Sequence, residues 1–145
     1  MALSEEANAI QVIIGESLSG QFIETVLNRL ESFGYEVTSA DTFLIAFSIQ
    51  KVEQKIKNEC NVTEIPEGMS AMAVDMICGH VLNSKYSVGQ LDLASIDLSG
   101  AIASVTQGSA SVSFDNATSD AAKFQSLIQK MMDGGDFACY RKIKW

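Results

Sequence analysis

Apolar residues recur every three to four positions along much of the chain, the spacing that places them on one face of an α-helix. This pattern predicts four helices, which we place at about residues 21–33, 39–60, 66–84 and 118–133. The third is apolar on nearly all sides, so we expect it to lie at the centre of a helical bundle.

Residues that begin or end helices flank these apolar segments. Gly34 follows the first predicted helix, at the position of a left-handed C-terminal cap. Thr38 stands three residues before Asp41, a variant of the capping box, and begins the second helix. Thr118 or Ser119 is placed to cap the last helix. These signals support the helices that they bound.

The start of the predicted helix 39–60 carries additional apolar residues. Phe43, Leu44 and Phe47 widen its apolar stripe, so we expect this end of the helix to be more deeply buried. Lysines and glutamates between positions 51 and 59 form the opposite face, which is most simply a solvated surface.

Residues 1–19 fit the helical pattern less well, and we treat them as an N-terminal extension of a single domain over residues 20–145. Ser4 is placed to cap a helix that has two glutamates in its first turn. The β-branched run at 10–14 would also suit a strand, although we favour the helix. An apolar extension of this kind can pack on a neighbouring subunit.

A spacing of two replaces the helical spacing in residues 102–114. Small residues alternate on both sides of Gln107 and Gly108, which predicts a β-hairpin with Gly108 in the turn. Such a hairpin is marginally stable alone in water, so we expect sheet or helix partners to complete it, including partners from other subunits.

The segment 136–145, DFACYRKIKW, gathers aromatic and basic residues in an acidic chain. Aromatic residues and arginine are enriched at the energetic centres of protein interfaces. Two interpretations stay open, because the segment could dock on another protein or fold back with Trp145 over its own core. We expect partner contacts from Phe137, Tyr140, Arg141, Lys142, Ile143, Lys144 and Trp145.

Composition narrows the class of protein. The 145 residues are 47% hydrophobic and 19% charged, which suits one folded domain rather than a disordered chain. The net charge of −8 disfavours a protein that reads nucleic-acid sequence, because such a protein needs a basic face. We expect neither a membrane span, which needs about 18 apolar residues in a row, nor a signal peptide.

Candidate chemistry is sparse. His80 is the only histidine, and its spacing from Cys60, Cys78 and Cys139 matches no common zinc signature. No nucleotide-binding or hydrolase motif occurs in the sequence. We therefore expect reduced thiols and no catalytic activity, metal or cofactor. A small metal-dependent or regulatory protein that uses His80 and the cysteines stays as an alternative.

Several short motifs follow one another in order along residues 20–145. They are LESFGY at 30–35, Asp41 at a helix start, KIKN at 55–58, Cys60-Asn61, IPE at 65–67, DMICG at 75–79, GSASVSF at 108–114 and YRKIKW at 140–145. Together they resemble the head–tail connector proteins of tailed bacteriophages, which are also called head completion or adaptor proteins. The YRKIKW segment after the GSASVSF strand is the most specific part of this resemblance.

The resemblance implies a mainly α fold, a small bundle of four to five helices with a β-hairpin and an extended C-terminal tail. It also implies a structural protein of the virion neck without catalytic activity, assembled in the cytoplasm of the host bacterium. Such proteins form a ring, typically of twelve copies, between the portal protein and the next neck or tail protein. DNA passes through the ring without sequence-specific binding.

Under this resemblance, the tail residues would bind the portal or a neighbouring subunit, and the hairpin would join neighbours in the ring. The expected ring contacts are Val105, Gln107, Gly108, Val112 and Phe114. A different ring protein of the neck or tail, such as a stopper or a tail terminator, is the main alternative. Those proteins tend to be richer in β-structure.

Overall fold

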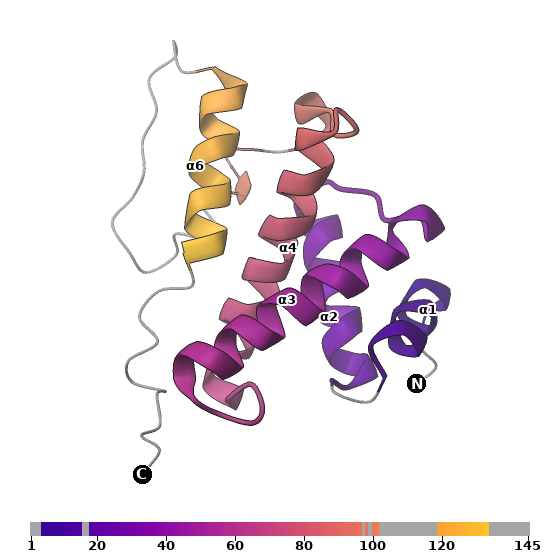
Figure 1. The fold of residues 1–145 in the computed structure, drawn as a ribbon. Coiled ribbons are helices and arrows are strands. Elements are labelled where there is room, and N and C mark those ends of the chain that lie inside the picture. The colour runs from indigo at the N-terminus through magenta and orange to yellow at the C-terminus, as the bar shows by residue number, and fades with distance from the viewer. Residues whose placement is uncertain (1–3, 16–17, 97, 99, 102–118, 134–145) are drawn as a thin grey trace.

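A computed structural model describes residues 4–15, 18–96, 98, 100–101 and 119–133. These residues form a mainly α structure of five packed helices, and this part of the chain contains no strand (Figure 1). The helices are α1 (Glu5–Ile14), α2 (Gly20–Ser32), α3 (Thr42–Cys60), α4 (Ser70–Ser87) and α6 (Asp120–Asp133). The predicted mainly α class is therefore confirmed, whereas the predicted hairpin and C-terminal tail lie outside the described residues.

Three short 3-10 helices accompany the longer ones. They span Ser39–Asp41 before α3, Glu67–Met69 before α4, and Leu93–Ser95 after α4. None of the helices in the described ranges combines the length and the apolar character needed to cross a membrane.

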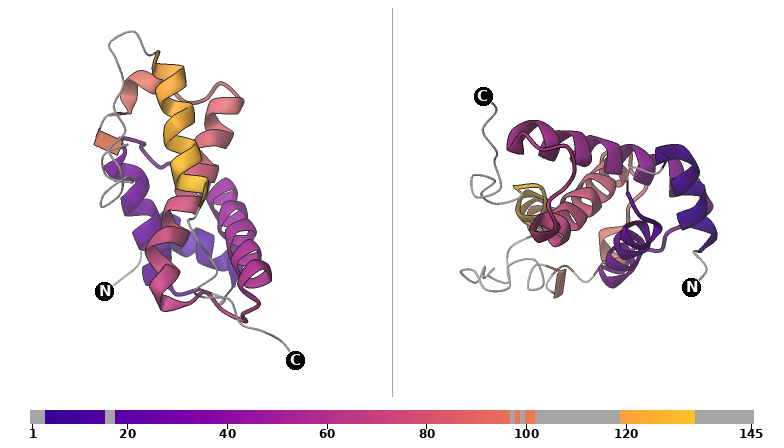
Figure 2. Two further views of the ribbon diagram at one scale, coloured as in Figure 1. Left: turned by 90° about the vertical axis from the view of Figure 1, so that its left-hand side faces the viewer. Right: turned by 90° about the horizontal axis from the view of Figure 1, so that it is seen from below.

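Helix α4 lies at the centre of the molecule and packs against α2, α3 and α6 (Figure 2). This confirms the position expected from its apolar sequence. Side chains on all sides of the helix are buried because neighbours cover it from three directions. The buried residues are Ala73, Val74, Met76, Ile77, Cys78, Gly79, Val81 and Leu82.

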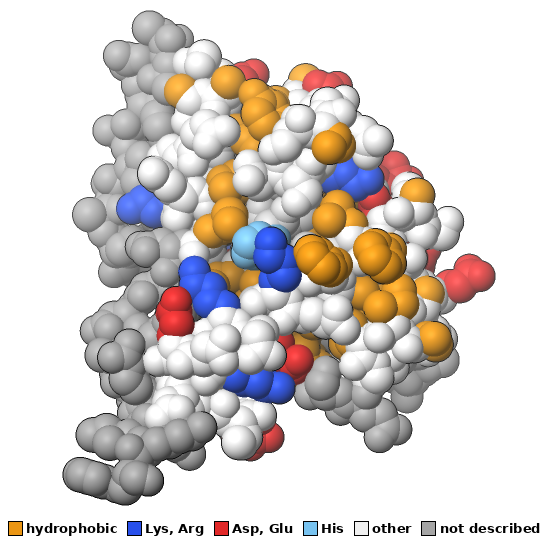
Figure 3. Space-filling view, in the orientation of Figure 1, with side chains coloured by type: hydrophobic (Ala, Val, Ile, Leu, Met, Phe, Trp, Pro, Cys, Tyr) orange, Lys and Arg blue, Asp and Glu red, His pale blue; other side chains and the backbone are white. Residues whose placement is uncertain are grey.

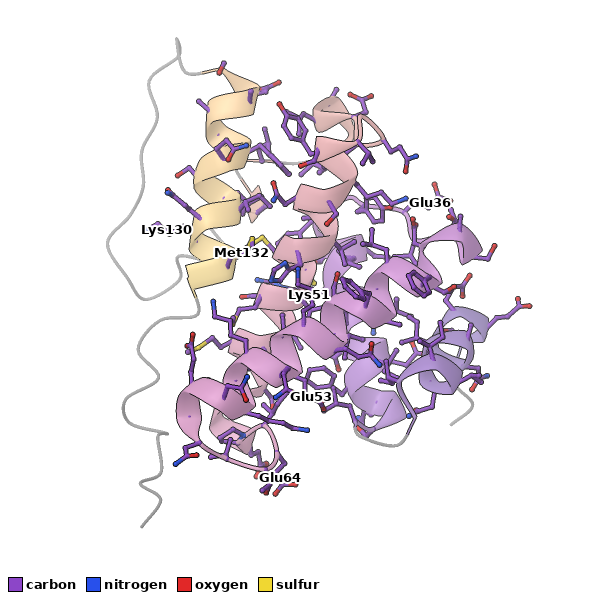
Figure 4. The ribbon with its side chains drawn as sticks, in the orientation of Figure 1. Glu36, Lys51, Glu53, Glu64, Lys130 and Met132 are labelled. Atoms are coloured by element: carbon purple, nitrogen blue, oxygen red, sulfur yellow. The ribbon has the colours of Figure 1, made fainter. Side chains whose placement is uncertain are left out.

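Helices α4 and α6 approach each other closely at Gly79. A Cβ atom at this position would lie 2.9 Å from Cγ of Met132 and 3.0 Å from Cβ of Met131. Met132 lies on the side of α6 that faces α4 (Figure 4). Glycine in the middle of a helix is usually unfavourable, but here it lets the two helices come together.

Helix α1 is an integral part of the bundle. Oγ of Ser4 accepts a hydrogen bond from the backbone N–H of Ala7 at 3.2 Å, which is the predicted N-cap. The run 10–14 is helical rather than extended, and Ile10 and Ile14 are buried where α1 packs against α2 and α3. The inner side of this N-terminal segment therefore contributes to the core of its own chain.

Two of the signals predicted to bound helices are present in the structure, although α4 spans Ser70–Ser87 rather than 66–84. Gly34 has φ of 92°, and the backbone N–H of Tyr35 donates to the carbonyl of Leu30 at 3.1 Å, as expected for a left-handed C-terminal cap. The capping box of Thr38 and Asp41 is also present. These signals locate helix ends because they provide partners for backbone groups that a helix leaves unpaired.

The expectation that Phe43 and Phe47 are deeply buried is wrong. Phe43 is 69% exposed and Phe47 is 49% exposed. An α-helix turns by about 100° per residue, so these positions lie about 160° and 200° around the axis from the buried Ile45. They therefore lie opposite the apolar stripe of α3 and do not widen it.

Candidate functional site

The outer face of α3 carries an exposed aromatic pair followed by two lysines. The rings of Phe43 and Phe47 stack with 6.4 Å between centroids and 11° between planes. Nζ of Lys51 lies 5.6 Å from the centroid of the Phe47 ring, within the range of a cation–π interaction. Lys55 lies one turn further along. We call Phe43, Phe47, Lys51 and Lys55 the α3 stripe.

Hydrophobic and basic side chains lie next to one another on this face of the molecule (Figure 3). Lys51 projects from the middle of α3, away from the core (Figure 4). The opposite side of the helix fixes this orientation, because Ile45, Ile49 and Val52 are fully buried. The α3 stripe is therefore presented by a helix that is anchored along its length, so its backbone has little freedom to lose on binding.

A buried polar network anchors the beginning of α3 to the end of α4. The Asp41 side chain is 3% exposed, and its Oδ1 lies 2.7 Å from Nζ of Lys85. Oδ2 of Asp41 accepts a hydrogen bond from the backbone N–H of Thr38 at 3.0 Å, and the hydroxyl of Tyr35 also donates to Asp41. The network joins the α2–α3 connection, the start of α3 and the last turn of α4.

The network also determines the charge of its members. Burial by itself would raise the pKa of Asp41, but hydrogen bonds from Lys85, Thr38 and Tyr35 and the charge of Lys85 hold it below its usual value. Burial, together with the neighbouring carboxylate, raises the pKa of Tyr35. Asp41 is therefore ionised and Tyr35 is neutral at pH 7, so the contact with Lys85 is a true ion pair.

The two lysines of the α3 stripe contrast with Lys57 and Lys85, which form ion pairs. Lys57 lies 3.7 Å from Glu53 in an ion pair, but no ion pair in the described part of the chain involves Lys51 or Lys55. His80 is half-buried near both lysines. Burial lowers the pKa of its imidazole, and the charges of Lys51 and Lys55 lower this pKa further. The surface is thus basic at pH 7, although the whole chain has a net charge of −8.

Two of the three cysteines lie in the core. Sγ of Cys78 is 3.7 Å from the carbonyl oxygen of Val26, and burial raises the pKa of this thiol. Sγ of Cys60 is 3.8 Å from Sδ of Met69. Within the described ranges, no three side chains of His, Cys, Asp or Glu are grouped so that they could hold a metal ion. Both cysteines are free thiols and are buried in the core.

A pocket of about 480 Å³ lies between α2 and α4. Nε of Arg29 is 2.8 Å from Oδ1 of Asp75 in this pocket, and the Arg29 guanidinium lies 4.6 Å from the centroid of the Phe33 ring. The ion pair joins α2 to α4, whereas the ring contact holds the guanidinium against the C-terminal end of α2 itself. Arg29 and Asp75 thus provide each other with an oppositely charged hydrogen-bond partner in the pocket.

The sequence did not single out the α3 stripe as a site. The partner contacts that it did single out, in the hairpin 102–114 and the tail 136–145, lie outside the described residues, whereas His80, Cys60 and Cys78 of the alternative metal-dependent interpretation lie within them. The stripe could have been found from the angular positions of Phe43 and Phe47, which are opposite those of Ile45 and Ile49 on a helix.

Comparison with known proteins does not assign the chain to a family. No family model, no curated protein and no solved structure matches it. A functional interpretation therefore depends on the motifs in the sequence and on the surfaces of the folded chain.

Proposed function

We propose that this chain is a head–tail connector of a tailed bacteriophage. It forms a ring that joins the capsid portal to the tail and continues the DNA channel. The α3 stripe is the structural observation that carries the proposal, because it is a surface suited to binding protein. The ordered motifs that resemble the connector family supply the specific identity.

The stripe suits a protein partner for two reasons. Two adjacent exposed phenylalanines are unfavourable in water. Complete burial of an exposed phenylalanine contributes about 1.5–3 kcal/mol. Phe43 and Phe47 are 69% and 49% exposed, so each can contribute a share of this. The neighbouring lysines add charge without carboxylate partners of their own in the described structure. Aromatic side chains surrounded by charged ones are typical of interfaces whose centre is apolar and whose rim is polar.

The helical architecture favours a connector over the other ring proteins of the neck. Stoppers and tail terminators tend to be richer in β-structure, whereas the described part of this chain contains helices and no strand. The acidic composition also suits a DNA channel, because a net charge of −8 disfavours tight binding to phosphate. DNA would then pass without sequence-specific contacts.

The proposed portal anchor is the tail, residues 136–145. Its aromatic and basic side chains suit an acidic groove on the portal. The test is to delete residues 140–145 and mix the purified protein with the portal encoded in the same genome. We expect electron micrographs to show rings on portals with the full chain and bare portals with the truncated chain.

The truncated protein must retain its helical circular dichroism spectrum for this comparison to hold. Rings of truncated protein on portals would contradict the anchoring role of the tail. The neck assignment itself is tested by mass spectrometry of purified virions. A virion without this chain would refute the assignment.

A further inference from the structure

We infer that neighbouring copies of this chain join through α1 of one copy and the α3 stripe of the next. The inference builds on the proposed ring, because it names the contact between its subunits. It comes from two exposed helix faces that complement each other in both apolar character and charge.

The first of these faces is the outer side of α1. Val12 is 84% exposed and Ile13 is 41% exposed, and Glu5 and Ala9 are exposed on the same side. Helix α1 contains no lysine or arginine. We call Glu5, Ala9, Val12 and Ile13 the α1 ridge. It runs from an acidic start to an apolar end.

The α3 stripe has the opposite order of charge and apolar character. It begins with two phenylalanines and ends with two lysines. If the helices are antiparallel, Val12 meets Phe47 while Glu5 meets Lys55. The spacings agree, since seven positions separate Glu5 from Val12 and eight separate Phe47 from Lys55. At 1.5 Å per residue, both distances are roughly 10–12 Å.

The two faces cannot meet within one chain. The inner side of α1, which includes Ile10 and Ile14, already packs against α2 and α3. Helices α1 and α3 form adjoining sides of the same molecule, as the view from below shows (Figure 2). A contact between the α1 ridge and the α3 stripe therefore requires two copies. Because it uses two different surfaces, it is a head-to-tail contact, which repeats to give a ring or a filament.

The distribution of exposed apolar residues supports this pairing. Among the described residues, five large hydrophobic side chains are exposed, and four of them belong to the α1 ridge or the α3 stripe. The fifth is Val88, which is 66% exposed at the end of α4 and belongs to neither surface. Val88 therefore provides a matched control of similar exposure.

The first experiment measures self-association of the full chain by sedimentation velocity, from about 1 μM to about 1 mM. We expect association that depends on concentration, and we expect Val12→Asp and Phe47→Asp each to raise the dissociation constant at least about tenfold. Val88→Asp should leave the dissociation constant unchanged. Circular dichroism checks that all three variants keep their helices.

The second experiment tests the head-to-tail arrangement. Val12→Asp retains an intact α3 stripe, and Phe47→Asp retains an intact α1 ridge. When mixed, they should form a complex of one copy each that grows no further. Lys55→Glu should weaken self-association, and adding Glu5→Lys to the same chain should restore it, because the charges then match again across the contact.

Three results would overturn the inference. They are a full chain that is monomeric at about 1 mM, variants that associate as well as Val88→Asp, and weakened variants that fail to form a complex when mixed. The last would indicate a two-fold contact instead.

Self-association through these faces by a protein that is absent from virions would refute the proposed function alone. Portal rings that tolerate both aspartate substitutions would refute the inference alone.

Discussion

Helices α3 and α4 are nearly the same length but have different roles. Helix α4 has 18 residues and is covered by three other helices, whereas α3 has 19 residues and is covered on one side. Substitutions in α4 should therefore change the stability of the fold. Substitutions on the outer face of α3 should leave stability unchanged and affect association instead. The difference separates the scaffold of this protein from the surface that it presents.

The largest expected difference between the two helices is the loss of stability when one large side chain in each is truncated. Ile77 in α4 is fully buried, so Ile77→Ala should lower the free energy of unfolding by about 2–5 kcal/mol. Phe43→Ala should change it by no more than about 0.5 kcal/mol, because Phe43 is largely exposed. Urea denaturation measures both. Equal losses from the two substitutions would show that α3 is not a surface helix.

The second prediction concerns the link between the two helices. Asp41→Asn keeps the size of the side chain but leaves the ammonium of Lys85 without its charged partner. Because the Lys85 side chain is 15% exposed and that of Asp41 is 3% exposed, we expect a loss of about 3 kcal/mol in urea denaturation. The comparison is Lys57→Gln, which should cost less, because the pair of Lys57 with Glu53 is longer, at 3.7 Å against 2.7 Å, and the new amide can still donate a hydrogen bond to Glu53.

The same ion pair predicts how stability depends on pH. The pKa of Asp41 is lower in the folded chain than in the unfolded chain, where it is about 3.9. Its stabilising contribution is therefore complete above about pH 4 and is lost as the pH falls through the folded value. The stability advantage of the wild type over Asp41→Asn should shrink across this range, as urea denaturation at pH 7 and at lower pH would show. A stability difference between the wild type and Asp41→Asn that does not change with pH would contradict the ion pair of Asp41 and Lys85.

Much of this fold follows from local sequence, and the reasons are physical. The buried apolar face of α6, formed by Phe124, Leu127, Ile128 and Met131, and the cap at Ser119 depend on residues within one or two turns, so a local pattern is sufficient to find them. The ion pair of Asp41 and Lys85 was not predicted, because it joins residues that are far apart in the chain. No local pattern reports such a contact.

The outer face of α3 was missed for a different reason. Phe43 and Phe47 are apolar and lie close in sequence to the buried stripe, so composition alone assigns them to it, but their angle around the helix axis places them on the opposite side. Their exposure is visible only when Ile45 is used as the reference direction, because positions two residues apart on a helix point to opposite sides. A contiguous group of large apolar residues on the polar side of an amphipathic helix, such as Phe43 and Phe47, is therefore a candidate interface that the sequence can offer.

The smallest expected effect concerns the contact between α4 and α6. Gly79→Ala gains about 1 kcal/mol of helix propensity, but its Cβ would lie too close to Met132 and Met131. Because Cβ of Met131 is fixed to the backbone of α6, we expect the clash to exceed the gain, with a net loss of about 1 kcal/mol. Introduced into a Met132→Ala background, Gly79→Ala should cost less, because the closest atom, Cγ of Met132, is then absent. A double-mutant cycle by urea denaturation measures this coupling, and strictly additive losses would show that α6 does not approach α4 at Gly79.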